Sequence, residues 1–229
     1  MNRVLSNTAL PGGSRLLRLS HASPDVVQPG QWFHLTLDDV SLSLPVLDAS
    51  PAEHWLAFQA PSELDGPGRG ADCQLDGPHG LPIAAPDGLR QLVLITDECG
   101  LPAALHAAAR DLPVTLVLAG LTSTDAIVRL RPSRFVVTGV DPGAIAGIGA
   151  LEDAGIPSRL AHPAPLPGCQ EGTIDALITS WLHSQSAEQR WHRSVHIIGQ
   201  TGTVESMQAL LRGQVGEYHA TSIPLQTSL

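Results

Sequence analysis

The order of hydrophobic and polar residues divides the chain into two parts with different patterns. Up to about residue 88, short runs alternate apolar and polar residues, which is typical of strands with one face toward a core. Turn residues such as glycine and proline separate these runs. The runs that predict strands are 15–19, 31–38, 40–47, 55–58 and 73–75. Strands at this spacing predict a small antiparallel β-barrel, with a sandwich as the alternative.

From residue 89 onward, apolar runs alternate with helix-forming segments. The runs 91–96 and 114–119 are continuous, which is typical of strands buried on both faces of a parallel sheet. The other predicted elements are strands 134–138 and 194–199 and helices 101–110, 125–129, 141–154, 173–183 and 203–211. This alternation predicts a parallel α/β domain of the nucleotide-binding type, followed by an irregular polar tail over 212–229. We therefore expect two domains, 1–88 and 89–229.

Composition excludes several classes of function. The 229 residues are 43% hydrophobic, so the chain can bury a core. Its formal net charge is −9, and the sequence has no run of basic residues. A negatively charged chain repels phosphate backbones and anionic membranes, so we expect neither nucleic acid nor a membrane as a partner. The sequence has no signal-peptide pattern and no run of 18 apolar residues, which favours a cytoplasmic protein.

Cysteine and histidine provide no recognisable metal site. The three cysteines, Cys73, Cys99 and Cys169, are far apart, which excludes a disulfide scaffold, a zinc ribbon and a four-cysteine iron–sulfur cluster. The ten histidines fit no zinc-binding spacing, so we expect no metal. Cys99 follows a strand and precedes a helix, where a thiol pKa can be lowered, and a packed, inert thiol is the alternative that we favour.

Three short motifs in order resemble the ferredoxin-reductase superfamily over about residues 3–211. Residues 29–35 read PGQWFHL, residues 77–80 read GPHG, and residues 166–172 read LPGCQEG before a predicted helix. Among members of that superfamily, the chain is most similar to the electron-transfer subunits of dihydroorotate dehydrogenase. The resemblance implies a protein that binds FAD across a barrel, takes a hydride from NAD(P)H and passes electrons to a protein partner, such as a catalytic subunit.

The resemblance assigns flavin-site positions in the first domain. Pro45 is the residue that remains of the family's Arg-Pro-x-Ser motif, and Gly77, Pro78 and Gly80 match the turn that closes the barrel. Arg69 and Gly70 lie in a glycine-rich stretch that could replace the missing phosphate site. The alternative, which we favour, is a surface turn with a solvated arginine.

The resemblance also assigns a nicotinamide site in the second domain. Gly100 and Pro102 match the glycine-rich turn after the first strand, whereas Gly199 ends the strand 194–199 and Gly202 follows it. The segment 97–98 is Asp-Glu, two carboxylates that would repel a phosphate or would instead favour the start of a helix; we favour the second reading. If the site works, Gly100→Glu should abolish NADH-dependent reduction of the flavin.

Two hypotheses of function remain. Leu44 and Leu47 stand where the family has an arginine and a polar residue, and the cluster cysteines are missing. The first hypothesis is a ferredoxin-reductase-like oxidoreductase or electron-transfer subunit with modified FAD and NAD(P)H sites and no iron–sulfur cluster. The second is a non-catalytic descendant of that family that acts as an interaction or regulatory subunit.

Overall fold

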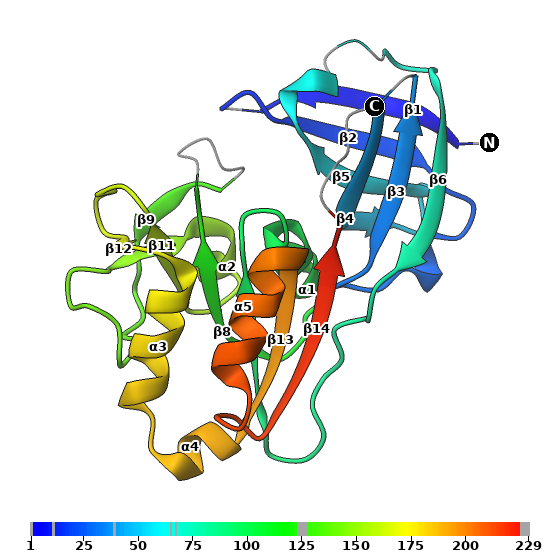
Figure 1. Ribbon diagram of the computed structural model, residues 1–229. Coiled ribbons are helices and arrows are strands. Elements are labelled where there is room, and N and C mark those ends of the chain that lie inside the picture. The colour runs from blue at the N-terminus through cyan, green and yellow to red at the C-terminus, as the bar shows by residue number, and fades with distance from the viewer. Residues whose placement is uncertain are drawn as a thin grey trace.

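The computed structural model describes residues 2–10, 12–38, 40–64, 66, 68–122 and 128–224. Figure 1 shows a β-barrel above an α/β part, joined by a long connection that runs down one side of the molecule. The fold predicted from the sequence, an N-terminal barrel followed by a parallel α/β arrangement, is confirmed.

Six antiparallel strands close the barrel in the order β1-β2-β5-β4-β3-β6. Their bounds are β1 Asn2–Ala9, β2 Arg15–Ser20, β3 Trp32–Leu37, β4 Val40–Ser50, β5 Trp55–Ala60 and β6 Asp72–His79. Short 3-10 turns, Pro24–Val26 and Ser62–Leu64, interrupt the connections. Side chains that alternate along the strands fill the interior, and Leu17, Phe33, Leu35 and Phe58 are almost fully buried there.

A six-stranded parallel sheet in the order β12-β11-β8-β7-β13-β14 forms the centre of the second part. The strands are β7 Gln91–Thr96, β8 Val114–Gly120, β11 Ser158–His162, β12 Gln170–Glu171, β13 Arg193–Gln200 and β14 Glu217–Ile223. A separate two-stranded ribbon pairs β9 Leu130–Pro132 with β10 Ala146–Ile148. The central strands have apolar side chains on both faces because helices cover both.

The helices form a layer on each face of this sheet. They are α1 Leu101–Ala109, α2 Gly149–Asp153, α3 Ile174–Ser184, α4 Ala187–Trp191 and α5 Thr201–Leu211. One apolar core includes α1 and α2, and the other includes α3 and α5 around the buried Trp181. Thr173 caps α3, and Ser186 with Gln189 forms a capping box on α4, which fixes where these two helices begin.

Two predicted elements between β8 and β11 are wrong. Residues 134–138 form no strand: the backbone N–H of Arg134 bonds the Glu152 carboxylate instead of a neighbouring strand, and Val136 is 93% exposed. The predicted helix 141–154 is reduced to α2, because its middle forms β10 and pairs with β9. Of the predicted helix 125–129, residues 125–127 lie outside the described residues.

The two ends of the chain are more regular than the sequence predicts. The tail over 212–229 contains β14, a full strand that pairs in parallel with β13 from Ser194 to Gln200. At the N-terminus, the strand β1 was missing from the sequence prediction and pairs with both β2 and β6. Both strands carry mainly polar residues, so the sequence shows no clear hydrophobic pattern from which they could be predicted.

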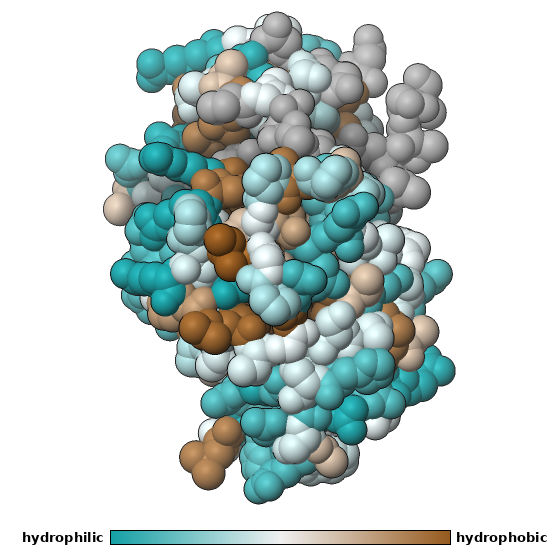
Figure 2. Space-filling view, turned by 90° about the vertical axis from the view of Figure 1, so that its left-hand side faces the viewer, coloured by the Kyte–Doolittle hydropathy of each residue, from teal (hydrophilic) through white to brown (hydrophobic). Residues whose placement is uncertain are grey.

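Strand β14 and helix α1 join the two parts of the molecule. The Thr221 hydroxyl of β14 accepts a hydrogen bond from the Leu81 N–H at 3.3 Å and lies 3.2 Å from the Leu81 carbonyl, just after the barrel ends. Gly80, with φ +83°, lies in close contact with Thr221 and Trp32. On the face shown in Figure 2, apolar surface gathers at mid-height, between the barrel and the α/β part.

Gly80→Ala should therefore weaken the junction. A Cβ atom at this position would lie 2.7 Å from Thr221 Cγ2, and the left-handed backbone disfavours any side chain. We expect the free energy of unfolding to fall by about 2–4 kcal/mol, measured by denaturant unfolding. The matched control is Gly202→Ala in α5, where a Cβ would meet nothing within 4 Å. If both variants unfold alike, the junction is not the sensitive element.

Candidate functional site

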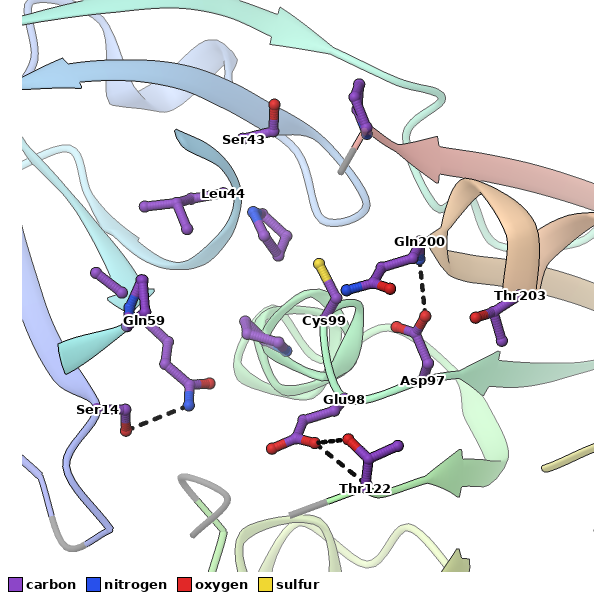
Figure 3. Close-up of a pocket in the computed structure, with 15 residues that line it drawn as sticks. Ser14, Ser43, Leu44, Gln59, Asp97, Glu98, Cys99, Thr122, Gln200 and Thr203 are labelled. Carbon is purple, nitrogen blue, oxygen red and sulfur yellow. Dashed lines mark hydrogen bonds between the residues drawn. The ribbon is translucent and has the colours of Figure 1, made fainter. Parts of the chain in front are cut away.

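A cleft with a volume of about 540 Å³ lies between the barrel and the carboxyl ends of the parallel strands. Figure 3 shows β4 and β5 on one side and the segments after β7 and β13 on the other. The barrel side is formed by Ser14, Ser43, Leu44, Pro45, Gln59, Ala60 and Pro61. The α/β side is formed by Asp97, Glu98, Cys99, Pro102, Thr122, Gln200, Thr203 and Pro224. Ligands of open α/β sheets bind at this edge of the sheet.

The barrel wall combines apolar and polar groups because side chains alternate along β4. Leu44 and Val46 belong to the barrel core, so Ser43 and Pro45 project from the opposite face of the strand. Beside them, the Gln59 side-chain amide donates to the Ser14 hydroxyl at 3.4 Å. This wall therefore offers both apolar side chains, among them Pro45, and neutral hydrogen-bonding groups.

The Asp97 carboxylate connects the two segments that form the α/β wall. One oxygen accepts a hydrogen bond from the Gly100 N–H at 3.0 Å, and the other accepts one from the Gln200 N–H at 2.7 Å. Burial raises the pKa of Asp97, while hydrogen bonds from Gln200, Gly100, Thr203 and Cys99 oppose that rise. The expectation that this acid favours the start of a helix agrees with these contacts.

Glu98 and Cys99 complete this wall. Glu98 accepts hydrogen bonds from the Thr122 N–H at 3.2 Å and from its hydroxyl at 2.7 Å, which ties the end of β7 to the end of β8. Figure 3 shows the Cys99 thiol pointing from the start of α1 toward the barrel side of the cleft. Burial, reinforced by the Asp97 and Glu98 carboxylates, raises the pKa of this thiol to about 12. The inert interpretation of Cys99 therefore agrees with the structure.

The structure brings four of the assigned residues to the cleft or to the layer directly behind it. Pro45 and Pro102 line it from opposite sides. Gly100 and Gly199 lie just behind the α/β wall, where a Cβ on Gly100 would be 2.2 Å from the Ile198 carbonyl oxygen. Gly100→Glu would therefore disturb packing whether or not a cofactor binds, so it does not test the nicotinamide site. Gly202 is in the first turn of α5 and does not line the cleft.

The other assigned residues lie away from the cleft. Arg69 and Gly70 form an exposed turn before β6, where the Gly70 N–H bonds the Val4 carbonyl at 2.8 Å. Gly77 and Pro78 lie on β6, where Gly77 packs against Phe33 and is joined to Pro78 by a cis peptide bond. With Gly80 at the junction, these residues have clear structural roles.

None of the described residues that line the cleft carries a positive charge. All 13 cationic side chains of the chain are arginines, and none of the described residues that line the cleft is among them. The lining instead includes two carboxylates. A ligand phosphate would therefore meet only neutral donors.

Sequence reasoning missed the polar groups of the barrel wall. Ser14, Ser43 and Gln59 were not singled out, and neither was Thr122. The only signal was the alternation of serine and leucine over residues 41–44, which places Ser43 on the outer face. Ser14 and Gln59 are far apart in the sequence and meet only because β2 pairs with β5.

Comparison with known proteins identifies the fold. No family model and no curated protein sequence matches the chain. Among solved structures, the ferredoxin reductase of a carbazole 1,9a-dioxygenase superposes with a TM-score of 0.70 at 18% identity, covering 96% of this chain and 68% of that one. A cytochrome P450 reductase from Amycolatopsis gives 0.69 at 16% identity, covering 98% and 70%. A ferredoxin NADP+ reductase from Neisseria gonorrhoeae, solved with bound FAD and NADP, gives 0.63 at 15% identity and 96% of both chains.

These matches show that the chain has the ferredoxin-reductase-like fold that its motifs predict. At 15–18% identity, they show the fold alone. The finer likeness to the dihydroorotate dehydrogenase subunits stays a prediction. Within the described residues, no helix is long and apolar enough to cross a membrane, and no group of three or more His, Cys, Asp or Glu side chains could hold a metal.

The thiols of the folded protein should react slowly. Burial raises the pKa of Cys73 to about 11 and of Cys99 to about 12, and it also raises that of Cys169. At pH 8 we expect little thiolate and therefore slow labelling by a disulfide reagent, with all three thiols reacting quickly after unfolding. If part of the labelling is fast, the Cys99→Ser variant shows whether Cys99 is the residue that reacts. Rapid labelling that disappears in this variant would show that Cys99 is a reactive thiolate.

Proposed function

We propose that this chain is a ferredoxin-reductase-like oxidoreductase or electron-transfer subunit that binds FAD in the cleft, accepts electrons from a reduced donor protein and passes them to a second protein partner in the cytoplasm. The observation that carries the proposal is the position of the cleft, between a closed barrel and the carboxyl ends of a parallel sheet. In this proposal, residues 1–88 form the flavin-binding domain, and residues 89–229 form the α/β domain that provides the other wall of the cleft.

The barrel wall fits the ring system of a flavin. The volume of about 540 Å³ lies within the range of ligand pockets, about 300–1,000 Å³. Pro45 offers an apolar contact to a planar ring, and Ser43 and Gln59 lie where they could hydrogen-bond its polar edge. FAD, when bound, would supply electron transfer in one- and two-electron steps. The role of the protein is to bind the ring, orient it and shield one face from water.

The diphosphate of FAD would be held without an arginine in this proposal. Ser14 and Gln59 supply neutral hydrogen-bonding groups at the barrel margin, and Arg69 lies on a turn that does not line the cleft. Neutral donors bind an anion more weakly than an arginine does, so the expected affinity for FAD is modest. The phosphates of NAD(P)H do not fit the α/β wall, because the Asp97 carboxylate already accepts the N–H groups there. No hydride step from NAD(P)H is therefore included.

One observation favours a second candidate function, that of a non-catalytic interaction subunit. The described lining of the cleft contains two carboxylates, Asp97 and Glu98, and no arginine, which disfavours every phosphate-bearing cofactor. The two candidates differ in a single measurable property, the binding of FAD.

The first test is the visible absorption spectrum of the purified chain. We expect bands near ~375 and ~450 nm after incubation with excess FAD and desalting. Flavin retained at close to one per chain supports the oxidoreductase. A folded protein that is colourless both as purified and after this incubation, and that does not change the fluorescence of added FAD in an equilibrium titration, would rule out FAD-dependent electron transfer and favour the interaction subunit.

A pair of glutamine variants tests whether the cleft is the binding site. Gln59→Ala removes a polar group from the barrel wall, and we expect the dissociation constant for FAD to rise several-fold in a fluorescence titration. Gln74→Ala changes an exposed residue of β6 that does not line the cleft, and it should leave the constant unchanged. Equal effects from both variants would place the flavin elsewhere.

A further inference from the structure

Two helices begin side by side at the α/β wall and share one acceptor. Helix α1 follows β7, helix α5 follows β13, and these two strands are neighbours in the sheet. The Asp97 carboxylate accepts the Gly100 N–H at the start of α1 and the Gln200 N–H at the start of α5. One side chain thus bridges both helix N-termini, and Figure 3 shows its hydrogen bond to Gln200.

The surroundings of Asp97 are shaped to admit this carboxylate. A Cβ atom on Gly199 would lie 2.6 Å from one of its oxygens, so residue 199 must be a glycine for the side chain to occupy this position. The Thr203 side chain and the Cys99 backbone also hydrogen-bond the carboxylate. These contacts favour its charged form and oppose the effect of burial on its pKa.

A phosphate group has the same requirements as this carboxylate. In parallel α/β sheets, nucleotide phosphates bind at helix N-termini, where backbone N–H groups and the helix dipole favour an anion. Here those N–H groups donate to Asp97, and the Glu98 carboxylate is the next residue in the sequence. A phosphate in this place would lose these donors and would meet the charge of Asp97 at close range.

We propose that Asp97 is a built-in anion that takes the place of a nucleotide phosphate at the N-termini of α1 and α5. Asp97 is thus the residue that determines specificity at this wall: it excludes nicotinamide dinucleotides and restricts the cleft to ligands without a phosphate there. The proposal concerns the α/β wall alone and does not depend on whether FAD binds at the barrel wall.

The test is whether an added anion restores the thermal stability that the Asp97→Ser variant loses, measured by thermal unfolding of the full chain. The variant leaves the N–H groups of Gly100 and Gln200 without their charged acceptor, so its melting temperature should fall by several degrees. Millimolar inorganic pyrophosphate, or NADH, should restore much of that loss in the variant and leave the wild type unchanged. Glu98→Gln removes one negative charge beside the site and keeps Asp97, so it should gain no response to either probe.

Three results would overturn the proposal. The first is a wild-type melting temperature that rises with NADH as much as that of the variant. The second is a folded variant that responds to neither pyrophosphate nor NADH. If Asp97→Ser does not fold, Asp97→Asn keeps the size of the side chain and removes its charge. The wild type can also be titrated directly with NADH, with the NADH fluorescence as the signal. A dissociation constant in the micromolar range would contradict the proposal even if neither variant folds.

Discussion

The close approach of the α1 N-terminus to β13 is the constraint on which the rest of the structure depends. Residue 100 has no room for a side chain because a Cβ atom there would lie 2.2 Å from the Ile198 carbonyl oxygen. This contact brings the segment after β7 against the segment after β13 and so allows one carboxylate, that of Asp97, to bond both. Helix α1, fixed in this way, packs against β4 of the barrel.

The fold could be predicted from the sequence wherever burial leaves a pattern. The strand β3 alternates Phe33, Leu35 and Leu37 toward the core, and β7 is apolar on both faces, so both were found. The strands β1 and β14 could not be found, because their stability comes from backbone pairing with distant strands. The segment 134–138 has the composition of a strand, but its backbone bonds the Glu152 carboxylate instead.

The site was harder to predict because the sequence does not show whether a glycine leaves space for a ligand or for another part of the chain. Gly100 and Gly199 were assigned to a cofactor, whereas in the structure they make room for a carbonyl oxygen and a carboxylate of the chain itself. The Asp-Glu pair was the informative signal, since its charge is opposite to that needed beside a phosphate. On the polar barrel wall, local alternation indicates Ser43 alone, whereas the meeting of Ser14 and Gln59 depends on the pairing of β2 with β5.

The strand β14 has a consequence for the order in which the protein assembles during synthesis. It ends at Ile223, and its Thr221 hydroxyl is bonded to the segment that leaves the barrel 140 residues earlier. The barrel strands can pair as soon as residue 79 has left the ribosome, whereas this edge of the sheet must wait until residue 223 has done so. Until then, β13 exposes an unpaired edge, which is the region of the nascent protein that a chaperone would have to protect.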